Sequence, residues 1–280
     1  MRHFTTSDGA CIAYRDEGAG TPLVLLHGLL AHGGFFRAQA PLAADHRLII
    51  VDLRGHGESQ IPNEAPGVER IAADVAELVE ALNLNDAIGV GWSLGATVLW
   101  HVLAGPAGKR FAGAVIVDMT ARVLNGGDWA LGLSPEACAA RSAAIRADFE
   151  GFALNAGQAI FAQPVAALMR ETAAWAGAEF ARNDPEAMAA VWESLVAQDA
   201  RALFSRIALP TLVVHGGQSQ LYGDDTAAHL VAALGDARAV RFDRAGHAPH
   251  LEEPEAFNRL LSDFAARLSR ARAAQPTNPN

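Results

Sequence analysis

Short apolar runs that alternate with helix-like segments are the feature of this sequence that most constrains its fold. Four such runs occur early in the chain: PLVLLHG (22–28), RLIIVDLRG (47–55), AIGVGWS (87–93) and AGAVIVDM (112–119). Strands that are buried on both faces have this nearly continuous apolar character. Between the second and third runs, residues 69–84 carry apolar side chains at helical spacing. The order strand, helix, strand predicts an α/β protein with a parallel sheet.

Three parts of the chain depart from this alternation. Residues 2–18 alternate polar and apolar side chains around Asp8-Gly9, which predicts an antiparallel hairpin at the N-terminus. Residues 121–207 are rich in alanine and indicate several helices without a strand, and the alternation resumes with PTLVVHGG at 210–217. The last residues contain helix breakers and no apolar pattern. We therefore expect a core formed by residues 1–120 and 208–272, a helical cap (lid) formed by 121–207, and a disordered tail at 273–280.

The composition disfavours several classes of protein. A chain of 280 residues that is 51% hydrophobic is long enough to bury a large core. Its net charge of −9 disfavours nucleic acid or an anionic membrane as a partner, because both attract clustered Lys and Arg. Cys11 and Cys138 are the only cysteines and lie far apart, so we expect neither a disulfide framework nor a cysteine-based metal site. Without a recognisable signal peptide or a long apolar span, a reducing cytoplasm is the expected location.

The sequence Gly91-Trp92-Ser93-Leu94-Gly95 lies between a predicted buried strand and a predicted helix. A serine on so sharp a turn requires small neighbours two residues away on either side, and the turn raises its hydroxyl above the sheet. The helix that begins at Leu94 also directs its N-terminal dipole at this point, which favours a developing oxyanion. We therefore interpret Ser93 as a nucleophile, and its alternative role is that of a helix N-cap.

Four motifs, in this order, resemble those of the α/β-hydrolase family. LLHGLL at 25–30 is similar to the loop after the third strand, and DLRGHGES at 52–59 to the family's DxRGxGxS turn. GWSLG at 91–95 resembles the nucleophile elbow, and RAGHAPHLEEPEAF at 244–257 resembles the loop with the catalytic histidine. The resemblance implies a mostly parallel central sheet with an N-terminal antiparallel hairpin, helices on both faces and a helical cap insertion.

The resemblance also implies a role for individual residues. Ser93 would attack an acyl carbon, and His247 would accept its proton and later pass it to the leaving group. The backbone N–H groups of Leu29 and Leu94 would form the oxyanion hole. Trp92 and Leu29 flank these positions and are predicted to contact the substrate. No metal and no cofactor are expected, since the ten histidines include no HExxH pair.

The acidic member of the triad is not at its usual place. In most of the family it lies three residues after the glycine of the strand that corresponds to TLVVHG, and here that residue is Ser219. Asp118 ends the neighbouring strand, where some members of the family carry their acid. We predict Asp118 as the partner of His247, with Ser219 an ordinary turn residue. Two alternatives stay open: Asp118 caps a following helix or turn, or the acid is Asp224 or Asp225, of which Asp225 resembles an N-cap.

These residues predict a serine hydrolase that cleaves a small, mostly apolar carboxylic ester or lactone through an acyl-enzyme intermediate. A serine at the elbow argues against haloalkane dehalogenases and epoxide hydrolases, which use aspartate there in this family. Hydrolysis of carbon–carbon bonds in ring-fission products, cofactor-free perhydrolysis and a non-catalytic ligand receptor are the alternatives. Carbon–carbon hydrolysis would favour polar or cationic side chains in the cap that hold a dienoate, and the sequence singles out none of the candidates Arg122, Arg141, Arg146, Arg170 and Arg182.

Overall fold

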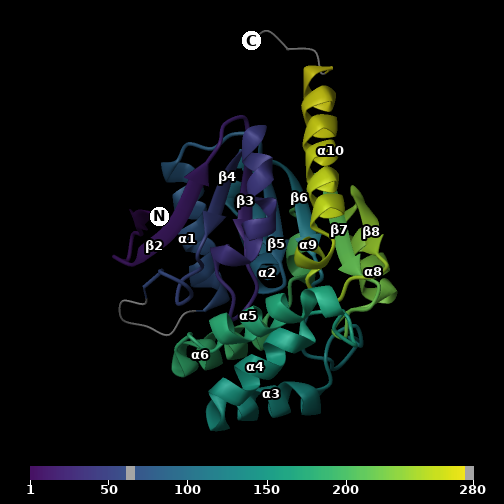
Figure 1. Ribbon diagram of the computed structural model, residues 1–280. Coiled ribbons are helices and arrows are strands. Elements are labelled where there is room, and N and C mark those ends of the chain that lie inside the picture. The colour runs from purple at the N-terminus through teal and green to yellow at the C-terminus, as the bar shows by residue number, and fades with distance from the viewer. Residues whose placement is uncertain (61–66, 275–280) are drawn as a thin grey trace.

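The computed structural model describes residues 1–60 and 67–274 and contains one eight-stranded sheet (Figure 1). Strands β1 (Arg2–Thr5) and β2 (Cys11–Glu17) form the predicted antiparallel hairpin. Gly9 lies in its turn with φ of +86°, a conformation that glycine adopts without steric cost. Strand β2 then pairs antiparallel with β4 (His46–Val51), which joins the hairpin to the rest of the sheet.

The remaining strands are parallel, as their apolar character predicts. The order across the sheet is β1-β2-β4-β3-β5-β6-β7-β8. Because β4 and β5 lie on opposite sides of β3, the direction of strand addition reverses at the β3–β5 pair, and in open α/β sheets such a point is where ligands bind. The bounds are β3 (Thr21–Leu26), β5 (Ala87–Trp92), β6 (Phe111–Val117), β7 (Thr211–Gly216) and β8 (Ala237–Phe242).

Helices cover both faces of the sheet, as predicted. A Cβ at Gly89 would meet the Leu99 side chain of α2 (Leu94–Ala104), whereas one at Gly113 would meet Leu268 of α10 (Pro254–Ala273). Gly113 pairs with Ile88, the residue before Gly89, so the two glycines face opposite sides of the sheet. The other helices of the core are η1 (Gly33–Ala44), α1 (Val68–Ala81), η2 (Pro106–Arg110), α8 (Asp224–Leu234) and α9 (Pro249–Glu252).

The interval between β6 and β7 is helical, and its main helices gather beyond one end of the strands (Figure 1). Two isolated bridges, Leu124 with Leu133 and Gly126 with Trp129, precede the first helix. The division into a core and a separate cap stays a prediction. The helices of the interval are α3 (Pro135–Ala147), α4 (Phe149–Ala159), η3 (Ala167–Met169), α5 (Arg170–Phe180), α6 (Pro185–Ala197) and α7 (Arg201–Phe204).

The C-terminal end differs slightly from the prediction of a disordered tail at 273–280. Helix α10 includes Ala273, and Ala274 still donates its N–H to Arg270 O. The helical hydrogen-bond pattern therefore extends past the point at which disorder was expected, and the rest of the predicted tail, 275–280, lies outside the described residues. No helix in the described part of the chain is both long and apolar enough to cross a membrane.

Candidate active site

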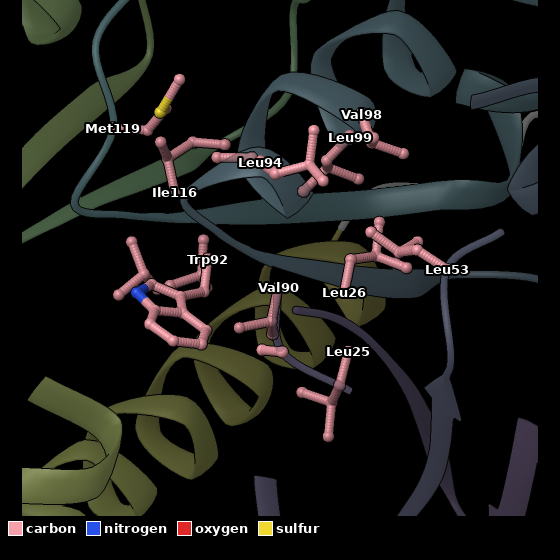
Figure 2. Packing of buried hydrophobic residues seen from close by; sticks show 14 of the residues in the cluster. Leu25, Leu26, Leu53, Val90, Trp92, Leu94, Val98, Leu99, Ile116 and Met119 are labelled. Atoms are coloured by element: carbon pink, nitrogen blue, oxygen red, sulfur yellow. The ribbon is translucent and has the colours of Figure 1, made fainter. Parts of the chain in front are cut away.

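Ser93 occupies the turn between β5 and α2, where two glycines make the sharp bend possible. Its backbone has φ of +54°, and the residue keeps part of its surface accessible. A Cβ at Gly91 would lie 2.4 Å from Gly95 O, and a Cβ at Gly95 would lie 2.2 Å from Leu26 O. No side chain larger than hydrogen fits either position without moving backbone, which explains the spacing of the motif. Figure 2 shows Leu94 and Leu99 of α2 on one side of β5, with Val90 and Trp92 on the other.

The loop after β3 lies directly against this turn. A Cβ at Gly28 would be 3.2 Å from the Ser93 Cβ, so the backbone that precedes Leu29 borders the serine. Leu29 itself is half-buried. Leu94 is the first residue of α2, and the N–H groups of the first helical turn have no acceptor within the helix. The two amides predicted to bind an oxyanion therefore lie on two segments that meet at Ser93.

The loop is held from both the core and the helical interval. His27 Nε2 accepts the N–H of Leu53 at 2.9 Å, and burial lowers the pKa of His27 well below its ordinary value, so the ring is neutral. On the other side, Asn183 Nδ2 donates to Leu30 O at 2.6 Å. Leu30 has φ of +69°, an unusual conformation for leucine. The surrounding hydrogen bonds help to hold its backbone in that conformation.

Asp118 and His247 meet at the carboxyl ends of the strands. Asp118 follows β6, and its Oδ2 lies 2.7 Å from His247 Nδ1. The Asp118 side chain is 0% exposed and that of His247 is 4% exposed, so water does not screen the pair. The next helix begins only at Pro135, which rules out Asp118 as the N-cap of a helix. The carboxylate is free to fix the tautomer and orientation of the imidazole.

Ser219 is more than the ordinary turn residue that we expected, and that prediction is wrong. Its hydroxyl donates to Asp118 Oδ2 at 2.6 Å and accepts the N–H groups of Leu221 and Tyr222 at 3.3 and 3.4 Å. A hydrogen bond to an ionised carboxylate is stronger than one between neutral groups. Ser219 therefore supports the carboxylate from the position that usually supplies it.

Neither of the loop carboxylates that were alternatives to Asp118 hydrogen-bonds to His247. Asp224 accepts hydrogen bonds from His215 Nε2 at 2.8 Å and from Arg241 at 2.7 Å, and its side chain is 63% exposed. Asp225 is exposed in the first turn of α8, whose N-cap is Gly223. The interpretation of Asp225 as the N-cap is therefore wrong by two residues, because the helix already begins at Asp224.

Glu252 holds the segment that carries His247, a role that the sequence analysis missed. Its Oε2 accepts the N–H of Gly246 at 2.7 Å, and its Oε1 accepts the N–H of Ala162 at 2.8 Å. Burial raises the pKa of Glu252 to about 7. A Cβ at Gly246 would lie 2.5 Å from Ala162 N, so glycine is required here by close backbone approach. The sequence after His247 contains three glutamates, Glu252, Glu253 and Glu255, and nothing in their pattern singled out Glu252.

Trp92 also contacts the segment that carries His247. Its side chain is buried, its indole N–H donates to His247 O at 2.8 Å, and its ring stacks on Phe35 with centroids 6.0 Å apart. These contacts position the histidine. The predicted contacts of Trp92 and Leu29 with a substrate stay predictions. Among residues 1–60 and 67–274, no three His, Cys, Asp or Glu side chains are grouped in a way that could hold a metal ion.

Comparisons with known proteins agree with the fold. The chain is 29% identical over 257 residues to the pimeloyl-(acyl-carrier protein) methyl ester esterase of Vibrio cholerae, and the match covers 90% of this chain and 96% of the relative. The esterase EaEST from Exiguobacterium antarcticum has the same fold, with a TM-score of 0.88 at 22% identity over 94% of this chain and 98% of that one.

A third similar protein is the esterase RhEst1 from Rhodococcus sp. ECU1013, with a TM-score of 0.82 at 28% identity over 95% of this chain and 98% of that one. Residues 23–260 match the family described as the alpha/beta hydrolase family. That match includes Ser93, Asp118 and His247 and most of both segments of the predicted core. The resemblance noted from the four motifs is therefore confirmed, and the chain belongs to the alpha/beta hydrolase family.

Proposed function

We propose that this protein is a serine hydrolase that cleaves a small, mostly apolar carboxylic ester or lactone. The observation that carries the proposal is the buried hydrogen bond of 2.7 Å between Asp118 Oδ2 and His247 Nδ1, on the edge of the sheet that also carries Ser93. A base oriented by a buried carboxylate, with a serine on a strained turn at the same edge of the sheet, is what acyl transfer would use. The names of the Vibrio and Rhodococcus relatives, both esterases, support the same class of reaction.

The proposed reaction has two halves. Ser93 Oγ attacks the acyl carbon while its proton passes to His247 Nε2, and the bond to the leaving alcohol then breaks as Nε2 returns the proton to that oxygen. A water molecule attacks the acyl-enzyme with the same base, which releases the acid and restores Ser93. In both halves the carbonyl oxygen becomes negative, and the N–H groups of Leu29 and Leu94 would stabilise it.

Asp118 has an electrostatic role in this scheme. The imidazole becomes positively charged at each transition state, and a carboxylate held in a buried site stabilises that charge more than it would in water. Because Asp118 accepts a hydrogen bond from Nδ1–H, Nε2 is the nitrogen available to the serine. A non-catalytic receptor has no need of this buried pair, so the enzyme is the hypothesis that we retain.

The test is the turnover of short p-nitrophenyl esters by the wild type and Ser93→Ala. We expect the substitution to lower kcat by roughly five to six orders of magnitude, as loss of the nucleophile does in serine proteases. A fluorophosphonate probe should label the wild type and leave Ser93→Ala unmodified. Ser134→Ala, which removes only the N-cap of α3, is the matched control and should retain full activity. Equal activity of Ser93→Ala and the wild type would reject the proposal.

A further inference from the structure

Two peptide units in the loop after β3 are joined by a hydrogen bond. One unit contains Gly28 O and the N–H of Leu29, and the other contains Leu30 O and the N–H of Ala31. The N–H of Ala31 donates to Gly28 O at 3.2 Å. In a trans peptide the N–H and the C=O point in opposite directions, so the N–H of Leu29 points away from this bond. That N–H has no acceptor in the part of the chain that the structure describes, and it is one of the two proposed to bind the oxyanion.

Asn183 holds the second of these peptide units. It follows α5, and its Nδ2 donates to Leu30 O at 2.6 Å and to Phe180 O at 2.9 Å. Both hydrogens of the amide nitrogen are therefore used. Phe180 is the last residue of α5, so the bond to its carbonyl oxygen fixes the amide on the end of that helix. The bond to Leu30 O then fastens the loop after β3 to a helix of the interval between β6 and β7.

The two peptide units differ in what holds them. His27 Nε2 accepts the N–H of Leu53, which leaves the ring proton on Nδ1, and Nδ1 donates to Gly28 O at 2.8 Å. The unit that contains Gly28 O is therefore held by the core. Among the described residues, Asn183 provides the only donor to Leu30 O. Because Leu30 has a φ that leucine rarely adopts, the orientation of the second unit depends on this bond.

The end of α5 packs against the residues after this loop at two further points. His32 Nδ1 accepts a backbone N–H at 3.0 Å, which leaves the ring proton on Nε2, and Nε2 donates to Glu179 Oε2 at 3.1 Å. The ring of Phe35 in η1 stacks on that of Phe180, with centroids 5.2 Å apart. The position of the Asn183 amide is therefore set by the packing of its helix as well as by its own hydrogen bonds.

We propose that Asn183 is a positioning residue for the oxyanion hole and aligns the N–H of Leu29 with the carbonyl oxygen of the substrate. The connection runs through three groups: Leu30 O, Ala31 N–H and Gly28 O. Hydrogen bonds in such a series polarise one another, so donation by Asn183 also makes the N–H of Leu29 a stronger donor. This inference rests on the proposed ester hydrolysis. A stronger donor matters most when the oxygen carries the negative charge of the transition state, so Asn183 acts on kcat rather than on substrate binding.

The experiment compares Asn183→Ala and Asn183→Leu with the wild type in the hydrolysis of p-nitrophenyl butyrate. Both variants lack the donor, and leucine keeps a side chain of similar size. We expect kcat to fall roughly 10- to 100-fold in both, with KM within about twofold, because a displaced oxyanion donor costs no more than a deleted one. Asn155→Ala, at an exposed position of α4, is the matched control and should keep the wild-type constants. Thermal melting establishes that each variant is folded.

Inhibition by hexyl trifluoromethyl ketone separates positioning from a merely structural role. Ser93 Oγ adds to the carbonyl carbon, the serine proton passes to His247, and the carbonyl oxygen becomes an anion in the oxyanion hole. The Ki of the ketone should rise in the Asn183 variants by about the factor by which kcat falls. The alcohol obtained by reduction of the ketone forms no covalent bond, and its Ki should stay unchanged.

Two results would overturn the assignment. Wild-type kcat in Asn183→Leu would mean that the size of the side chain, and not its N–H, holds the loop. A lower kcat with an unchanged Ki of the ketone would mean that Asn183 does not act through the oxyanion hole. Should both variants fail to fold, Asn183→Asp, which is closest in shape and cannot donate, takes their place with the same expectations. A folded wild type that neither hydrolyses esters nor reacts with the fluorophosphonate probe would instead reject ester hydrolysis itself.

Discussion

The ends of β6 and β7 are neighbours in the sheet. The acid usual in similar proteins follows the strand that corresponds to β7, whereas here the carboxylate that contacts His247 follows β6. Val117 pairs with Val214, so both strands end at the same edge, one with Asp118 and the other with the turn that contains Ser219. A single oxygen, Asp118 Oδ2, accepts hydrogen bonds from His247 Nδ1 at 2.7 Å and from Ser219 Oγ at 2.6 Å. Parallel strands present their carboxyl ends to one place, so either strand can supply the acid to the same histidine.

The substitution with the largest expected effect is Asp118→Asn, which tests whether the acid comes from the end of β6. We expect kcat for ester hydrolysis to fall by about four orders of magnitude, because an amide cannot stabilise the imidazolium and favours the wrong tautomer. Thermal melting would establish that the variant is folded. Asp225→Asn is the matched control and should behave like the wild type, since Asp225 is exposed on α8. Near-full activity of Asp118→Asn would show that the acid comes from elsewhere.

A second test exchanges the residues at the ends of β6 and β7. The double variant Asp118→Ser with Ser219→Asp moves the carboxylate from the end of β6 to the end of β7. We expect kcat roughly 10- to 100-fold above that of Asp118→Asn, because Ser219 Oγ already lies within hydrogen-bond distance of the site that the acid occupies. Steady-state kinetics with one p-nitrophenyl ester measures the difference. No recovery would mean that only β6 positions an acid correctly.

The hydroxyl of Ser219 is tested by Ser219→Ala. Removal of one hydrogen bond to a carboxylate should lower kcat about tenfold, with little change in KM, because the carboxylate then holds the imidazole less firmly. Ser219→Thr keeps the hydroxyl and should retain most of the rate. If Ser219→Ala and the wild type have equal kcat, the hydroxyl serves only the turn in which Leu221 and Tyr222 donate to it.

The last prediction concerns stability rather than catalysis, and it concerns Glu252, which accepts the N–H of Gly246 in the segment that carries His247. The pKa of Glu252 is about 7 in the folded chain against an ordinary 4.5, so the protonated form favours folding. Its contribution is complete below pH 4.5 and is lost as the pH rises through 7. Between pH 5 and 8, the free energy of unfolding of the wild type should therefore fall by about 2 kcal/mol relative to Glu252→Gln. Urea denaturation at the two pH values measures it, and a constant difference would contradict the prediction.

Local sequence pattern was sufficient to predict the fold and part of the candidate site. Short apolar runs that alternate with helical segments predicted the parallel strands. GWSLG marked the turn at Ser93, because steric limits on the backbone are set by adjacent residues. The histidine could be chosen from ten because its motif is also local. For the acid, the sequence reduced the choice to a few strand ends and loops, since a missing residue at one end pointed to its neighbour.

Only the tertiary structure decided which distant side chains meet. Asp118 is 129 residues from His247 and 101 from Ser219 along the chain, and their hydrogen bonds exist because β6 and β7 pair in one register. The contact of the Arg141 guanidinium with the Trp192 ring likewise depends on how α3 packs against α6. Helical periodicity does not reveal that packing. Sequence pattern determined which elements form and which residues end them, whereas strand register and helix packing determined which charges lie within reach of one another.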